Sequence, residues 1–115
     1  MNDLNQYRRT LRLTISIPIV ISGVNADGNG FSESAHTQVV NKHGGKIAMT
    51  HYLDAGAEVL VENRAIAAMA KARVVRLGEK DHARDLYIVA IELLEMANVW
   101  GITFPPIDGN TVASG

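Results

Sequence analysis

Cysteine is absent from this chain of 115 residues, which excludes disulfides, thiolate metal sites and cysteine nucleophiles. Aromatic residues make up only 5%, and no apolar run reaches the ~20 residues that span a bilayer. A strong charge of one sign is also lacking, because 11 Lys and Arg stand against 12 Asp and Glu, which disfavours a binder of nucleic-acid polymers. The length suits one domain, and the apolar fraction of 47% is typical of a globular protein.

The centre of an apolar-rich stretch over residues 11–24 is preceded by three arginines, and this order superficially resembles a signal peptide. Polar residues interrupt the stretch repeatedly, and no small-x-small cleavage site follows it. We therefore interpret the stretch as part of the fold. The expected protein is cytoplasmic, has no membrane span and exists as a monomer or a homodimer.

Alternation of apolar and polar residues is the clearest local pattern. Leu13 and every second residue up to Ile21 are apolar, and the run is rich in β-branched residues, which predicts a half-buried strand over residues 12–21. Pro18 cannot donate a ladder hydrogen bond, so this strand lies at a sheet edge or is bulged near its middle. The other predicted strands cover residues 34–40, 46–50, 57–61, 68–77, 86–94 and 100–104.

Turn-forming residues separate these segments at intervals of about 8–12 residues. The predicted turns lie within residues 23–30, 43–45, 53–56 and 78–85. The segment 86–94 is apolar almost throughout, which is typical of a strand covered on both faces. Six or seven strands without a predicted helix indicate an all-β fold, either a closed barrel or a sandwich.

Arg8, Arg9 and Arg12 form a local positive patch with only Asp3 nearby. The guanidinium group offers paired donors that suit phosphate oxygens or the O6 and N7 edge of guanine. In an extended chain Arg8 and Arg12 lie ~13 Å apart on one face, so they would contact different parts of a large anionic ligand. The alternative is that all three are solvated arginines beside an edge strand.

The spacing of Arg8 and Arg12 resembles the Arg-x-x-x-Arg opening of a PilZ domain, and Pro18-Ile19 matches the Pro-Val-like pair of that family's first strand. The resemblance continues over about residues 8–104. It implies a six-stranded antiparallel β-barrel that binds cyclic di-GMP.

Many members of this family place a helix after the barrel, and here that helix is short or absent. The part of the barrel that this helix would cover must then be covered by residues 100–106 or by another subunit. The resemblance therefore divides the chain into a flexible N-terminal arm at residues 1–7, a PilZ-like barrel domain at 8–106 and a C-terminal tail at 107–115.

The family's second motif, Asp/Asn-x-Ser-x-x-Gly, is matched in part. Asn41 takes the first position, His43 stands where Ser is expected, and Lys46 stands where Gly is expected. Glycine permits a positive φ and a close approach of the backbone to a ligand. We expect Gly44 and Gly45 to supply this freedom just before the usual place. His43 can form hydrogen bonds and stack on a base, as a bulkier substitute for Ser.

A register shifted by one residue would put Val40 on the first position of the motif and Gly45 on the last. We prefer the register that starts at Asn41. In that register Ile47 and Met49 keep the inward parity that follows the motif in the family.

By the resemblance, the arginines hold guanine and phosphate groups, Asn41 binds a guanine edge and His43 lines the same pocket. The alternative for Asn41 is a side chain that caps its own turn, and the alternative for His43 is an exposed turn residue. The predicted ligand-binding residues are Arg8, Arg9, Arg12, Asn41, His43, Gly44 and Gly45.

No set of acid, base and nucleophile is recognisable, so we do not expect an enzyme. His36, His51 and His82 lack a metal-ligand spacing, so neither a metal nor a cofactor is expected. The resemblance implies a cyclic di-GMP receptor in bacterial second-messenger signalling, which passes its signal to an unidentified protein partner. The alternative is a divergent PilZ-like protein-interaction module that does not bind the nucleotide.

Overall fold

The computed structural model describes residues 12–25 and 27–104. Arg8 and Arg9, the arm predicted at residues 1–7 and the tail predicted at 107–115 lie outside this part. No helix within it has the length and hydropathy needed to cross a membrane. The described chain forms the strands β1 (Leu13–Thr14), β2 (Pro18–Val24), β3 (Gly30–Asn41), β4 (Gly44–Met49), β5 (Glu58–Asn63), β6 (Ala68–Asp81) and β7 (Leu86–Leu93).

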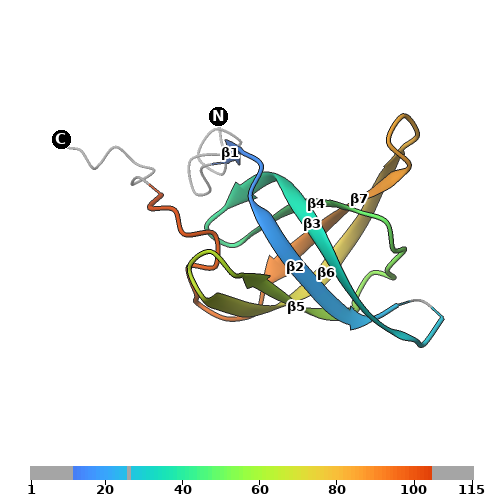
Figure 1. The fold of residues 1–115 in the computed structure, drawn as a ribbon, viewed down its shortest axis with the longest axis horizontal. Coiled ribbons are helices and arrows are strands. Elements are labelled where there is room, and N and C mark those ends of the chain that lie inside the picture. Colours follow the sequence, from blue (N-terminus) through green and yellow to red (C-terminus); the bar gives the residue numbers. More distant parts are fainter. Residues whose placement is uncertain (1–11, 26, 105–115) are drawn as a thin grey trace, which may run out of the picture.

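Six of these strands close into an antiparallel barrel. The order around the barrel is β3, β2, β5, β6, β7 and β4, and β4 pairs again with β3 (Figure 1). The short β1 pairs with β3 close to the start of β2. The predicted all-β fold and the six-stranded antiparallel barrel are confirmed, with β1 as an additional strand.

The alternation read from the sequence separates the barrel interior from its outer wall. Ile17, Ile19 and Ile21 are buried, as their common parity predicts, whereas Ile15 of the same parity is 39% exposed. Ile21, Ile47 and Val61 are completely buried, and burial of each such side chain stabilises the fold by about 1.5–3 kcal/mol. The other large side chains that are completely buried are Val40, Met49, Leu53, Val74, Val89 and Val99.

The first predicted strand is divided in two, because residues 15–17 between β1 and β2 are not strand. They keep two backbone hydrogen bonds to β3, from the Ile15 amide to the Gln38 carbonyl and from the Thr37 amide to the Ile17 carbonyl. Pro18 lacks an N–H and stands at the first position of β2, where a strand tolerates proline. Thr37 of β3 bridges the gap. Its buried Oγ1 accepts a hydrogen bond from the Ile17 amide at 2.8 Å and donates one to the Ile15 carbonyl at 2.7 Å.

The hairpin of β6 and β7 is longer than predicted. Residues 78–81, expected to form part of a turn, continue β6 as far as Asp81. Register shifts occur between Val74 and Arg76 and again before Lys80. Bulges of this kind bend a strand and increase its twist. Figure 1 shows the hairpin projecting from the barrel beyond its neighbouring strands.

The strand predicted over residues 86–94 is confirmed as β7, but its expected burial and the strand predicted over residues 100–104 are wrong. The segment 86–94 is not covered on both faces: Val89 is completely buried, whereas Ile88 and Ala90 are half-buried on the outer wall. Residues 100–104 do not form a strand. The six barrel strands pair with one another in a closed ring, and this segment does not extend any of them as β1 does.

Side-chain hydrogen bonds hold the C-terminal segment against the barrel instead. Trp100 is buried, and its Nε1 donates to the Asn41 carbonyl at 3.0 Å. Asn63 is also buried, and its Nδ2 donates to the Val99 carbonyl at 3.0 Å. The described part of the predicted covering segment, residues 100–104, therefore packs on the core through Trp100 and through the half-buried Ile102 and Phe104.

Candidate functional site

The pairing of β1 with β3 brings Arg12 to the hairpin between β3 and β4. Leu13 lies opposite Val40, so Arg12 precedes the pair at the level of Asn41. Arg12 and this hairpin line one open hollow of about 200 Å³. The predicted site residues that the hollow brings together are Arg12, Asn41, His43, Gly44 and Gly45. Arg8 and Arg9 lie outside the described residues.

The hairpin turn consists of Lys42 and His43, with Asn41 paired to Gly44 across it. The Oδ1 atom of Asn41 accepts a hydrogen bond from the His43 amide at 2.7 Å. Asn41 therefore caps its own turn, as the alternative interpretation expects. The cap uses the side-chain oxygen, so only the NH₂ group of Asn41 is suited to donate to a ligand. His43 is an exposed turn residue.

The expectation for Gly44 and Gly45 is wrong in its physical reason. Both glycines lie in β4, outside the turn, and neither has a positive φ. A Cβ atom on Gly44 would collide with the Ile91 carbonyl oxygen, and one on Gly45 would lie 2.7 Å from the Val39 carbonyl oxygen. Glycine is required here because neighbouring strands approach closely, and not because a positive φ is needed.

The strand that follows the second motif has the inward residues expected for it. Ile47 and Met49 are both completely buried, as their inward parity predicts. Lys46 lies between Gly45 and Ile47 at a half-buried position on the outer wall of β4.

Sequence reasoning did not assign Lys46 or Arg76 to the site, yet both line the same hollow as Arg12. Lys46 of β4 and Arg76 of β6 are each in register with Ala90 of β7, one on either side. Residues directly opposed in an antiparallel sheet share a face, so the three side chains stand on one wall. The two cations are 30 residues apart in the sequence, and only the strand order of the closed barrel brings them together.

A larger groove of about 740 Å³ continues from the hollow along the outer wall towards the hairpin of β6 and β7. The two share Lys46, Arg76 and Ala90 among their lining residues, and Gly78 and Ile88 line the groove farther along. Pockets for small molecules usually enclose about 300–1,000 Å³. The hollow alone is too small for a dinucleotide, whereas the hollow and groove together offer enough room.

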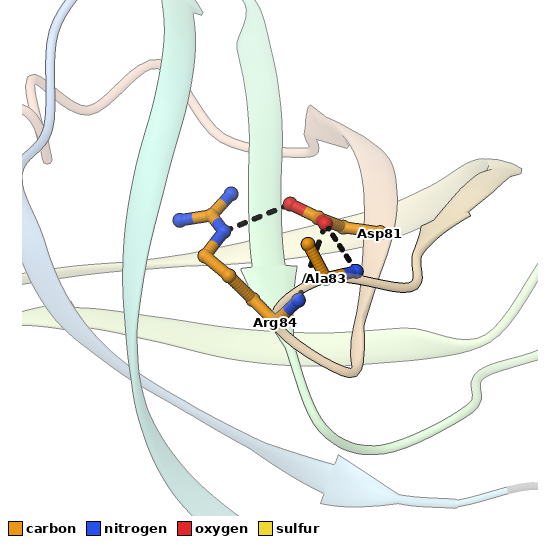
Figure 2. Close-up of polar contacts among 3 residues, drawn as sticks. All are labelled: Asp81, Ala83 and Arg84. Atoms are coloured by element: carbon orange, nitrogen blue, oxygen red, sulfur yellow. Dashed lines mark hydrogen bonds and ion pairs between the residues drawn. The ribbon is translucent and has the colours of Figure 1, made fainter.

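Ion pairs neutralise several charged residues that border the groove. Figure 2 shows the turn at the end of the β6–β7 hairpin, where Arg84 folds back onto Asp81. The hydrogen bond from Arg84 lowers the pKa of Asp81, and the bond from Lys80 lowers the pKa of Asp85. The ion pairs of this region are Arg84–Asp81 at 2.8 Å, Lys80–Asp85 at 2.9 Å and Arg73–Glu92 at 3.4 Å.

Arg12, Lys46 and Arg76 are a different case. Among the side chains that the structure describes, no carboxylate forms an ion pair with any of these three cations. Glu92 also lines the hollow but is paired with Arg73, so the charges around the hollow are mainly positive although the whole chain has a formal net charge of −1. Such a hollow attracts anions more strongly than the overall charge suggests.

The three histidines discussed above do not form a metal centre. His51 Nδ1 lies 2.6 Å from Glu33 Oε1, while His36 and His82 line two different grooves. Burial raises the pKa of Glu33, but hydrogen bonds from His51 and the Thr50 amide outweigh this and lower it below its ordinary value. Within residues 12–25 and 27–104, no three His, Asp or Glu side chains are grouped so that they could hold a metal ion.

A separate apolar hollow of about 310 Å³ lies beside the C-terminal segment. Trp100, Ile102 and Phe104 contribute to its lining, together with Lys42 of the β3–β4 turn. Met96 stands at this hollow and is 88% exposed, more than any other large apolar side chain among the described residues.

Fold and site together define a small closed β-barrel with a cationic hollow on its outer wall. A scan against protein-family models gave no match, and a search of curated proteins gave no match either. The functional argument therefore depends on the geometry of the described residues and on the sequence motifs.

Proposed function

We propose that this protein is a receptor for cyclic di-GMP in bacterial second-messenger signalling, with no catalytic activity of its own. The observation that carries the proposal is that Arg12 and the β3–β4 hairpin line one hollow. These two parts of the chain carry the two motifs that resemble a PilZ domain, and they are about 30 residues apart in the sequence.

The chemistry of the hollow suits such a ligand. The Arg12 guanidinium offers paired donors to a phosphate or to the O6 and N7 edge of guanine. The Asn41 NH₂ group and the exposed His43 ring stand at the same hollow, where they can bind and stack on a base. The adjoining groove provides room for the rest of a dinucleotide along the barrel wall.

Titration calorimetry with cyclic di-GMP tests the proposal. We expect micromolar or tighter binding, loss of binding in Arg12→Ala and strong weakening in Arg8→Ala. Arg64→Ala is the matched control, because this exposed arginine lies in the turn between β5 and β6 and lines neither the hollow nor the groove. Absence of heat and of any thermal shift at saturating ligand would refute the receptor proposal.

His43 provides a second test of the same site. If its ring crowds the place where the family motif has Ser, His43→Ser tightens binding. Unchanged affinity would mean that the ring points away from the ligand.

The second candidate function is a protein-interaction module that does not bind the nucleotide. The apolar hollow beside Trp100 and the exposed Met96 favour it, because such a surface can receive an apolar side chain of a partner. Lys46 at the usual glycine position favours it too. If this candidate is correct, the calorimetric titration with cyclic di-GMP gives no heat, and Arg12→Ala behaves in it like the wild type.

A further inference from the structure

We propose that Lys46 and Arg76 form a phosphate clamp over Ala90, a second anion-binding point where the small hollow meets the larger groove. The clamp takes the phosphate or pyrophosphate group of a nucleotide. It deepens the proposed function and rests on it only for the identity of the nucleotide, because the clamp itself can be tested with inorganic pyrophosphate.

The register of the strands places the two cations on opposite sides of one small residue. Lys46 and Arg76 are each directly paired with Ala90. Neighbouring strands lie about 4.7–4.9 Å apart, so the two Cα atoms are separated by roughly 10 Å. Side chains as long as Lys and Arg can close this distance from both sides onto one phosphate group. Between Lys46 and Arg76 the sheet carries only the methyl group of Ala90.

The charges around the clamp support an anionic ligand. The neighbouring cations Arg73, Lys80 and Arg84 each have a carboxylate partner within 3.4 Å. Lys46 and Arg76 have no such partner among the described side chains. Two cations placed side by side repel each other, and an anion between them relieves this repulsion.

The position of the clamp also fits the size of the ligand. Lys46, Arg76 and Ala90 line both the hollow of about 200 Å³ and the groove of about 740 Å³. A ligand that begins at Arg12 and extends along the groove must therefore pass over Ala90. A phosphate at that point contacts both cations.

Lys46 stands where the family motif has glycine, so two interpretations of this residue give opposite predictions. If Lys46 only obstructs the close approach of a ligand, Lys46→Gly tightens binding. If Lys46 is half of a phosphate clamp, Lys46→Gly and Lys46→Gln both weaken it.

The test uses two probes on the full chain, inorganic pyrophosphate followed by amide NMR shifts and cyclic di-GMP followed by calorimetry. We expect pyrophosphate to shift the amides of Lys46, Arg76 and Ala90. We expect Lys46→Gln and Arg76→Gln each to weaken both probes by about three- to tenfold, since a single exposed charge contributes modestly. Lys42→Gln is the matched lysine control, because Lys42 belongs to the same hairpin but lines the apolar hollow. Arg64→Gln is the matched arginine control.

The outcomes separate the clamp from the receptor. Shifts with pyrophosphate but no binding of cyclic di-GMP would support the clamp and refute the proposed function. Binding of cyclic di-GMP that is unchanged or tightened by Lys46→Gly would support the proposed function and overturn the clamp. Absence of pyrophosphate shifts at Ala90, or equal weakening by the control variants, would also overturn the clamp.

Discussion

Thr37→Val is the substitution that most directly tests how the barrel holds Arg12 in place. Valine has nearly the same shape as threonine but lacks the hydroxyl group. The change removes the hydrogen bond from the Ile17 amide at 2.8 Å and the bond to the Ile15 carbonyl at 2.7 Å. Both bonds connect β3 to the residues between β1 and β2, directly after the strand that begins beside Arg12.

The expected loss follows from the burial of these groups. Thr37 is 2% exposed, so the Ile17 amide loses its partner away from water, which costs about 1–3 kcal/mol. Ile15 is 39% exposed, so its carbonyl is more readily hydrated and contributes about 1 kcal/mol. The added methyl group offsets about 0.8 kcal/mol. We expect a net loss of about 1–3 kcal/mol and a fall in Tm of roughly 4–12 °C.

The assay combines urea denaturation with hydrogen exchange of the Ile17 amide, which should exchange faster in Thr37→Val. Thr37→Ser is the matched control, because it keeps the hydroxyl and loses only a methyl group, at a cost of about 1 kcal/mol. If Thr37→Val proves as stable as Thr37→Ser and the Ile17 amide stays protected, the hydroxyl does not hold this segment and the reasoning is refuted.

Three further predictions concern other parts of the barrel. Gly44→Ala should lower the free energy of unfolding, measured by urea denaturation, by at least about 3 kcal/mol, because the added Cβ would collide with backbone atoms. Gly28→Ala, in an open turn, should lower it by about 1 kcal/mol. Equal losses in the two variants would contradict this account. Trp100→Phe removes the bond from Nε1 to the Asn41 carbonyl and should lower stability by about 1 kcal/mol, and an unchanged Tm would speak against that bond. Because the pKa of Glu33 is lowered in the folded state, its contribution to stability is complete above about pH 4.5 and is lost as the pH falls through the folded-state pKa. The difference in unfolding free energy between wild type and Glu33→Gln should therefore shrink on acidification. A difference that does not change with pH would refute this prediction.

The barrel itself could be predicted from the sequence because its signals are local. Alternating burial at Ile17, Ile19 and Ile21 follows from the period of two along a strand, and turn residues mark the ends of strands. The failures were places where a distant partner decides the structure. The interruption at residues 15–17 is stabilised by Thr37, which lies some 20 residues farther along the chain.

The residues of the candidate site also fall into those that local sequence signals could find and those that depend on distant pairing. Arg12 and Asn41 were found by motif spacing, and the pairing of β1 with β3 brings them together. Lys46 and Arg76 were missed because their relation exists only across β7 in the closed barrel. No pattern within one segment contains that information, since it depends on the order in which all six strands pair.

The contacts around the site make the β3–β4 hairpin more rigid than Arg12. Both strands of the β3–β4 hairpin are fixed: β3 by the pairing of Leu13 with Val40 and by the bond from Trp100 to the Asn41 carbonyl, and β4 by its pairing with β7. The hairpin is therefore pre-organised, and little conformational entropy is lost when it binds a ligand. Arg12 is exposed and precedes a strand of only two residues, so its guanidinium retains many rotamers until an anion selects one. Lys46 and Arg76 lose side-chain freedom in the same way, but their backbone is already held by ladder pairing with Ala90. Arg12 lies outside the ladder, just before a strand of two residues. For the same side-chain ordering, a phosphate contact at the barrel wall therefore costs less backbone freedom than one at Arg12.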